Sequence, residues 1–166
     1  MCVTPEAPKT VLLVRLQLAI AALWWGGISG LSFVAVPTLF ASLGDPGVAG
    51  PVAALLFSLQ CWAGLLLGLV FLLLLRSERG RQDGKNASSE EAERLRRTLV
   101  SMGWVILAMM LALMQELGVA QRIVTARASG GDLRLWHTLG SLMVLGQWLC
   151  AGVLLWRLSA AHTAKR

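Results

Sequence analysis

Four long apolar segments constrain this chain more than any other feature. None of them contains Lys, Arg, Asp or Glu, and they run from Leu16 to Val36, Val52 to Leu75, Leu99 to Gln115 and Leu135 to Trp156. A helix of about 20 residues crosses the roughly 30 Å hydrocarbon core of a bilayer. The shortest segment reaches this length once Glu116 is placed at the membrane interface. Because every backbone amide must be paired in hydrocarbon, these segments predict membrane-spanning helices.

The composition favours the same fold class. Hydrophobic residues make up 56% of the chain and charged residues 14%, which leaves too little polar surface to cover a water-soluble globule of 166 residues. We therefore predict an all-α integral membrane protein, a four-helix up-and-down bundle that forms one domain over residues 1–166. The helices are expected at about 12–40, 51–75, 89–128 and 133–158, with a loop at 76–88.

The basic residues lie beside the expected helix ends and are unevenly shared between the two sides. With a cytoplasmic amino terminus, twelve Lys and Arg residues lie inside, and only Arg122, Arg127 and Arg134 lie outside. Cytoplasmic loops carry such an excess, so both termini and loop 76–88 are predicted to be cytoplasmic. The connection from Pro37 to Pro51 has no Lys or Arg and is expected outside. With this distribution the net charge of +6 does not indicate nucleic acid as a partner.

Small residues recur every four positions on the first two predicted helices. Ala22, Gly26 and Gly30 form one stripe, and Gly64 and Gly68 form a second. Such stripes let two helix backbones approach closely in a membrane. We expect the first two helices to pack on each other through them, and a dimerisation face is the alternative. The expected partners are accordingly membrane lipids, with other membrane proteins or a homo-oligomer as alternatives.

Pro37 follows the last turn of the first apolar segment. Proline has no N–H to donate, and its ring crowds the carbonyl group four residues earlier. We therefore expect Pro37 to kink or end the first helix at the outer surface and so to mark the helix boundary.

The residues around Pro37 also resemble a known family. The stretches are Leu23 to Gly27, Phe33 to Phe40, Ala49 to Gly50 and Leu56 to Phe57. They are similar to the opening of a bacterial domain family of unknown function, which is related to the eukaryotic transmembrane protein 205 family. Arg134 to His137 resembles the Arg-x-x-His step that begins the family's last helix, although Thr138 here replaces a glycine. The resemblance implies a four-span integral membrane protein and no established chemical activity.

Glu116 and His137 are the candidates for a polar site at the outer ends of the third and fourth predicted helices. The third and fourth helices are joined at the outer face, so these two residues should lie at similar depth. Gln115 adjoins Glu116, and Arg134 lies one turn before His137, which completes a candidate polar cluster of four residues. Because imidazole titrates near neutral pH and a carboxylate would hold the imidazolium, the cluster fits a proton-linked or ligand-binding site. Ion pairing that joins two helices at the interface accounts for the same residues.

Uncharged polar residues lie deeper in the expected spans. Gln60 and Gln147, with Ser29 and Ser32, are expected to form hydrogen bonds to one another between helices. Such bonds stabilise a bundle without implying a path for a substrate.

No sequence motif indicates catalysis. Gly-x-Ser-x-Gly, His-Glu-x-x-His and a phosphate-binding glycine loop are all missing from the sequence. We therefore predict no enzyme, no catalytic residue, no cofactor and no metal site. Haem or metal binding through His137 is kept as an alternative, but His137 is the only histidine within an apolar segment, and a haem between helices usually needs a pair.

These observations favour a small multi-pass protein of the bacterial inner membrane that acts as a structural or accessory component. The first alternative is a transporter-like or ligand-binding protein that uses the outward-facing Glu, His and Arg cluster. The second alternative is metal or haem binding through His137.

Overall fold

The computed structural model describes residues 8–79, 89–123, 125 and 130–163, and the regular structure within these ranges is helical. Four helical stretches are long and apolar enough to cross a membrane: Leu12–Leu43, Pro46–Ser77, Ala92–Ile123 and Leu133–Ala160. The predictions of an all-helical chain and of four candidate spans are therefore confirmed.

The first span is one continuous helix of three parts. α1 covers Pro8–Gly30, a π-helical segment η1 covers Leu31–Ala35, and α2 covers Val36–Leu43. The helix ends at Gly44, whose φ of 64° is left-handed and whose N–H bonds the carbonyl of Phe40 at 3.1 Å. Glycine adopts this conformation without a steric cost, so it is a common helix end.

Of the two outcomes expected at Pro37, a kink or a helix end, the helix end is not found. Pro37 lies in the first turn of α2, directly after the π-helical turn, where the N–H of Val36 bonds the carbonyl of Leu31. A π turn is wider than an α turn, so it accommodates a residue that cannot donate and that crowds the preceding turn. Pro37 therefore marks a change of helix type, and the helix continues to Leu43.

The expected long connection from residue 37 to 51 is also much shorter in the structure. α3 covers Pro46–Arg79, so Pro51 lies inside a helix and only Gly44 and Asp45 separate the first two spans. Asp45 caps α3: its carboxylate Oδ1 accepts the N–H of Gly47 at 2.7 Å, and its carbonyl accepts the N–H of Ala49 at 2.9 Å. An aspartate cap followed by proline is a favourable start for a helix.

The third span consists of α4, Ser89–Leu113, and a second π-helical segment η2, Met114–Ala120, and it continues as helix to Ile123. On the exposed face of α4, Arg97 bonds Glu93 at 3.0 Å in i,i+4 spacing. The last span is α6, Leu133–Thr163, which starts where Asp132 Oδ1 accepts the N–H of Leu135. The predicted loop 76–88 begins inside α3, and its residues 80–88 lie outside the described residues.

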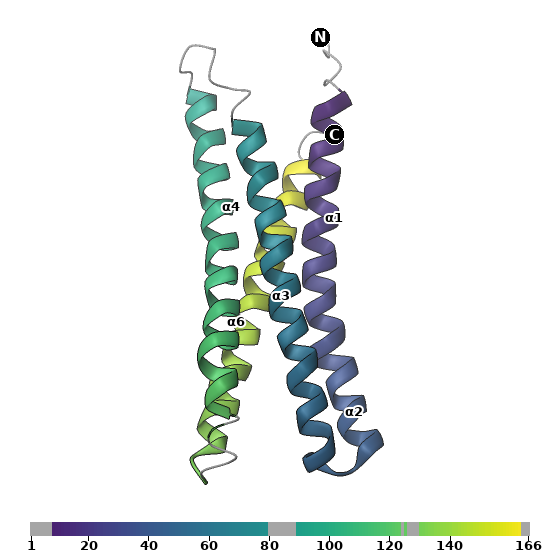
Figure 1. Cartoon of the computed structure of the whole chain (residues 1–166). Helices are drawn as coiled ribbons and strands as arrows, with labels where there is room; N and C mark the ends of the chain where they lie inside the picture. The colour runs from purple at the N-terminus through teal and green to yellow at the C-terminus, as the bar shows by residue number, and fades with distance from the viewer. Residues whose placement is uncertain (1–7, 80–88, 124, 126–129, 164–166) are drawn as a thin grey trace.

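The four spans form a ring in which each helix has two neighbours. α6 packs against α1 and α4, and α3 packs against α4 and, less extensively, against α1. The start of α1 and the end of α6 lie at one end of the bundle, here called the terminus end (Figure 1). The turn between α2 and α3 lies at the other end, here called the turn end.

The packed core extends from the middle of the bundle to the terminus end. Trp24 of α1, Phe71 of α3, Val105 of α4 and Leu154 of α6 are its central members, and each is buried. We call this region the packed half. Interdigitated side chains of this kind replace lipid contacts with close protein contacts, which is the main favourable term for helix association in a membrane.

The two stripes of small residues have different surroundings. A Cβ atom added at Gly64 would lie 3.1 Å from Trp24 Nε1, and one at Gly68 would lie 2.7 Å from Met109 Cγ. The stripe on α3 therefore makes room for large side chains of α1 and α4. Ala22, Gly26 and Gly30 are exposed, and a Cβ at either glycine would meet nothing within 4 Å. The expected contact between the two stripes is not formed.

Candidate functional site

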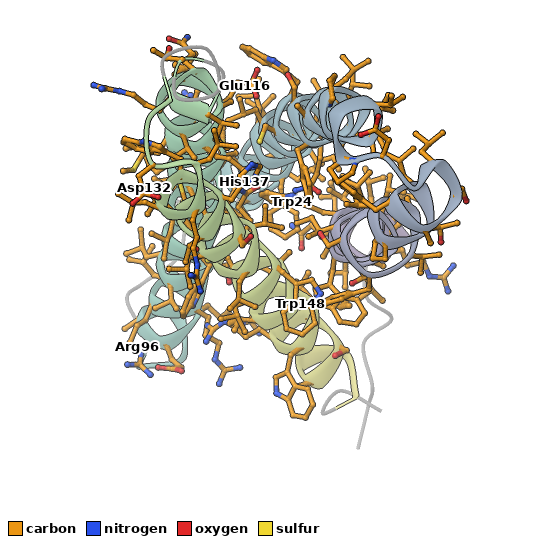
Figure 2. All side chains as sticks on the ribbon, turned by 90° about the horizontal axis from the view of Figure 1, so that it is seen from below. Trp24, Arg96, Glu116, Asp132, His137 and Trp148 are labelled. Atoms are coloured by element: carbon orange, nitrogen blue, oxygen red, sulfur yellow. The ribbon has the colours of Figure 1, made fainter. Side chains whose placement is uncertain are left out.

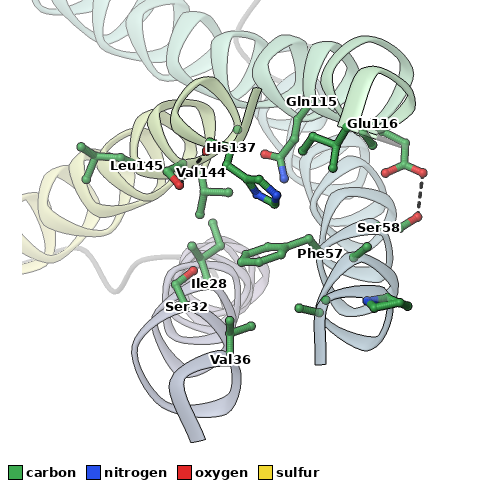
Figure 3. A pocket seen from close by; sticks show the side chains of 18 of the residues that line it. Ile28, Ser32, Val36, Phe57, Ser58, Gln115, Glu116, His137, Val144 and Leu145 are labelled. Carbon is green, nitrogen blue, oxygen red and sulfur yellow. Dashed lines mark hydrogen bonds between the residues drawn. The ribbon is translucent and has the colours of Figure 1, made fainter. Parts of the chain in front are cut away.

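A cavity of about 940 Å³ opens between all four spans in the turn-end half of the bundle (Figure 3). Its wall is largely apolar, with a few polar side chains. The residues labelled in the close view are Ile28, Ser32, Val36, Phe57, Ser58, Gln115, Glu116, His137, Val144 and Leu145. We call this region the hollow half.

Small residues on facing helices leave this volume open. Gly50, Ala53 and Ala54 of α3, Ala120 of η2 and Gly140 of α6 all line the cavity. A Cβ added at Gly140 would meet only Val119, at 3.5 Å, which is an ordinary contact. No large side chain of a neighbouring helix therefore occupies the space beside Gly140.

Both π-helical segments border the cavity. η1 contributes Ser32 and Phe33 to the wall, and η2 contributes Gln115, Glu116 and Leu117. A π turn shifts the side chains that follow it relative to a regular helix, and such turns are frequent at functional sites. Two of them at one cavity set this end of the bundle apart from the terminus end.

Gln115 is the most deeply buried polar group on the wall, with 7% of its surface exposed. Its Oε1 accepts a hydrogen bond of 2.8 Å from Nε2 of Gln147, a residue of α6 that is 1% exposed. This bond joins the third span to the fourth. The amide nitrogen of Gln115 has no hydrogen bond within the described residues, and it points toward the ring of His137 (Figure 3).

Glu116 is engaged with α3 and not with His137. The hydroxyl of Ser58 donates to Oε1 of Glu116 at 2.6 Å. In the close view this pair lies on the other side of Gln115 from the imidazole (Figure 3). The expected pairing of the Glu116 carboxylate with His137 is therefore not formed, and the ion pairs within the described residues are those of Glu93 with Arg96 and Arg97.

His137 lines the cavity and Arg134 does not. The His137 side chain is exposed and lines the cavity, and within the described residues its ring makes no hydrogen bond. Seen along the bundle, His137 and Glu116 project from neighbouring helices (Figure 2). Arg134 is exposed and does not line the cavity. The predicted cluster thus supplies Gln115, Glu116 and His137 to one cavity and leaves Arg134 outside it.

Trp148 lines the cavity, and a hydrogen bond and a ring contact hold its indole in place. Its Nε1 donates to the hydroxyl of Ser29 at 2.8 Å, and that hydroxyl donates to the carbonyl of Trp25 at 2.8 Å. The ring of Phe33 meets Trp148 edge-on with centroids 6.1 Å apart. These contacts fix the indole on the side of the cavity between α1 and α6.

The deeper polar residues are paired differently from the prediction. Ser29 and Gln147 do bond between helices, but to Trp148 and Gln115 and not to each other. The hydroxyl of Ser32 and the amide of Gln60 are buried without a hydrogen-bond partner in the described structure. An unpaired hydroxyl on the cavity wall is a group that a bound molecule can satisfy.

Ser58, Phe57 and Gly140 line the cavity but were not predicted as site residues from the sequence. Each lies in an apolar segment where it resembles ordinary span composition. For Ser58, the sequence signal was a hydroxyl on the second span at about the membrane depth expected for Glu116. Which helix faces of two spans meet is set by packing and is not given by residue type.

The donor set at the cavity does not indicate a metal centre. Within the described residues no three His, Cys, Asp or Glu side chains are grouped so as to hold a metal ion. The cavity instead combines an apolar wall with amide, hydroxyl and imidazole groups. Such walls suit organic molecules of low polarity.

Residues 19–132 match the model of a family described as a domain of unknown function, DUF4149. The match covers well over half of the chain and most of the first three spans, and α6 with His137 follows it. No curated protein and no solved structure matches the chain.

Proposed function

The chain belongs to the DUF4149 family of domains of unknown function and has four candidate membrane spans, and on this premise we propose that it binds a lipid-soluble molecule between its spans. The observation that carries the proposal is the cavity of about 940 Å³ in the hollow half. Ligand cavities commonly have volumes of about 300–1,000 Å³, apolar walls and a few convergent polar groups. Ser32, Gln115 and His137 are such groups here.

The contrast within the bundle supports a binding site over a packing defect. Protein interiors contain few voids larger than a water molecule. In the packed half, the same four spans bury Trp24, Phe71 and Leu154 to 3% exposure or less. The hollow half stays open because small residues, among them Gly50, Ala54 and Gly140, line it where large ones could fill it.

The orientation in the membrane is part of the proposal. Both termini would be cytoplasmic in an up-and-down bundle, and the cavity would open near the outer face of a bacterial inner membrane. The uneven distribution of basic residues supports this orientation. The positions of the α1 start and the α6 end at one end of the bundle agree with it (Figure 1). A relation to the transmembrane protein 205 family rests on the sequence resemblance.

A structural or accessory role without a ligand is the competing function. It is favoured by two hydrogen bonds that join spans, Gln147 to Gln115 and Ser58 to Glu116. It predicts that polar side chains near the cavity matter only through these bonds. It gives no reason for small residues at Gly50, Ala54 and Gly140, where larger apolar residues would improve packing.

The test is to fill the cavity from a position where a side chain fits. In Gly140→Leu the new side chain enters the open volume, because its Cβ meets only Val119 at 3.5 Å. Gly118→Leu is the matched control: Gly118 lies on η2 at the same end of the bundle, is exposed, does not line the cavity, and has nothing within 4 Å of an added Cβ. Each full-length protein is purified in detergent, and bound apolar molecules are identified by native mass spectrometry.

The proposal expects a bound lipid-soluble mass in the original protein and in Gly118→Leu, and its loss in Gly140→Leu. All three proteins should unfold at similar denaturant concentrations. If the three carry the same bound masses, or none, the binding function is wrong and the structural role is favoured.

A further inference from the structure

Besides the exposed side chain of Gln121, three polar groups on the cavity wall make no hydrogen bond within the described residues. The amide nitrogen of Gln115 has no hydrogen bond within the described residues, and neither does the ring of His137. The hydroxyl of Ser32 is buried and has no partner there. These groups come from the third, fourth and first spans and face one cavity (Figure 3). An occupant that bonds to them would satisfy groups that are otherwise costly in a membrane.

Each of these three groups can donate a hydrogen bond. A side-chain amide nitrogen carries two N–H groups and no acceptor, whereas a hydroxyl and a neutral imidazole each carry one donor hydrogen and can also accept. The acceptor of the Gln115 amide is already taken by Gln147. The carboxylate of Glu116 accepts from Ser58 and lies away from the imidazole (Figure 3). A head group with acceptor oxygens is therefore the one that can bond to all three groups.

The charges around the cavity exclude two classes of head group. No Lys or Arg is among the described residues that line it, so a carboxylate or phosphate would lack a counter-ion and would lie near Glu116. A cation would depend on Glu116, whose carboxylate already accepts from Ser58 and lies away from the imidazole (Figure 3). An uncharged head group avoids both penalties.

The wall also indicates a flat, apolar molecule with access from the lipid. Phe33, Phe57 and Trp148 present aromatic surfaces to the cavity. Phe33 and Leu145 line the cavity and yet are 63% and 46% exposed on the bundle surface, so its edge meets the hydrocarbon. An apolar tail attached to a ring in the cavity would leave along this edge.

Building on the proposed function, we infer that the occupant is a lipid-soluble molecule whose uncharged head carries carbonyl oxygens, as in the ring of a quinone, bound by Gln115, His137 and Ser32. The ester carbonyls of a diacylglycerol are a second source of the same acceptor. The inference concerns binding and assigns no redox step to the protein.

The experiment measures retention of four probes by the full-length protein in detergent: decylubiquinone, dioleoylglycerol, dodecanoate and dodecyltrimethylammonium. Two variants remove wall groups, Ser32→Ala and His137→Leu. Their matched controls are Ser77→Ala, near the terminus end, and Thr138→Ala, beside His137 but outside the cavity wall. Ser32→Ala leaves no protein group unpaired, so it is expected to fold normally.

We expect decylubiquinone to be retained most strongly. Its dissociation constant should rise about fivefold in Ser32→Ala and by at least as much in His137→Leu, as expected for the loss of one hydrogen bond. Both control variants should bind as the original protein does. Stronger retention of dioleoylglycerol with the same variant effects would support the carbonyl head and identify an ester lipid as its source.

Preferred retention of dodecanoate or dodecyltrimethylammonium would overturn the inference, since it would mean a charged head group. Binding of decylubiquinone that both wall variants leave unchanged would overturn it as well. If Gly140→Leu removes a native apolar molecule while none of the four probes is retained, the carbonyl inference fails and the proposed binding function stands. If no variant changes any bound mass, both fail.

Discussion

The packed half and the hollow half are built from the same four helices and differ in how small residues are matched. In the packed half several glycines meet large side chains of another helix: an added Cβ at Gly68 would lie 2.7 Å from Met109, and one at Gly152 would lie 3.0 Å from Trp25. In the hollow half an added Cβ at Gly140 would meet only Val119, at 3.5 Å, and Gly140 lines the cavity. Where small and large residues are matched the helices pack closely, whereas unmatched small residues on the cavity wall leave space open.

The largest expected effect comes from removing the same side chain in the two halves. Phe71 is fully buried in the packed half, and Phe40 lines the cavity and is 38% exposed. Phe71→Ala should lower the free energy of unfolding by about 3 kcal/mol, at the low end for buried aromatic residues because the surroundings are apolar in both states. Phe40→Ala should cost less than about 1 kcal/mol, since it enlarges a space that is already open.

The measurement is reversible unfolding of each variant in mixed detergent micelles, followed by circular dichroism. Equal losses for Phe71→Ala and Phe40→Ala would break the comparison, because they would mean that the hollow half is as tightly packed as the other.

The next effect tests the matching of small and large residues directly. In Gly68→Ala the new methyl group overlaps the Met109 side chain and approaches Trp24 Cη2 to 3.2 Å, so stability should fall by about 1–2 kcal/mol. Gly30→Ala lies on the exposed stripe of α1 and should be neutral or stabilising by up to about 1 kcal/mol. The same unfolding assay compares the two, and size-exclusion chromatography follows the oligomeric state. A destabilised or dissociated Gly30→Ala protein would show that the α1 stripe has a partner.

The bond from Gln147 to Gln115 lies at the junction of the two halves. Gln147→Leu removes the donor and leaves Oε1 of Gln115 buried without a partner, so stability should fall by about 1 kcal/mol. The double variant Gln115→Leu with Gln147→Leu should recover part of this loss, because no polar atom is then left unpaired. A double-mutant cycle measures the coupling, and additive losses would mean that the two amides act independently.

The fold was predictable from the sequence where composition alone decides. The four spans follow from the uncharged apolar segments, since nothing else satisfies the backbone in hydrocarbon. The helix ends were predicted less well because Pro37 and Pro51 were given more weight than Gly44, Asp45 and Pro46. Those three residues form a helix stop, a cap and a favoured first position, and the sequence contains this signal.

The site was predictable only in part. Gln115, Glu116 and His137 were found because polar groups near the membrane are costly without a role. Their partners Ser58 and Gln147 depend on the rotation of each helix about its axis, which the two π-helical turns alter locally. Arg134 was assigned to the cluster by its spacing from His137, and the structure places it outside the cavity.

The smallest expected change in the free energy of unfolding has opposite signs at two serines of the first span. Ser29→Ala removes the acceptor of Trp148 Nε1 and should destabilise the protein by about 1 kcal/mol. Ser32→Ala removes a buried hydroxyl that has no partner, so the empty protein should become more stable by a few tenths of a kcal/mol to about 1 kcal/mol.

With decylubiquinone present, Ser32→Ala should be less stable than the original protein. Only the original protein then gains the hydrogen bond from this hydroxyl to the ligand. Unfolding titrations of both variants with and without decylubiquinone measure the two signs. If Ser32→Ala destabilises the empty protein, the hydroxyl already has a structural partner. The hydroxyl would then not be free to bond to a ligand.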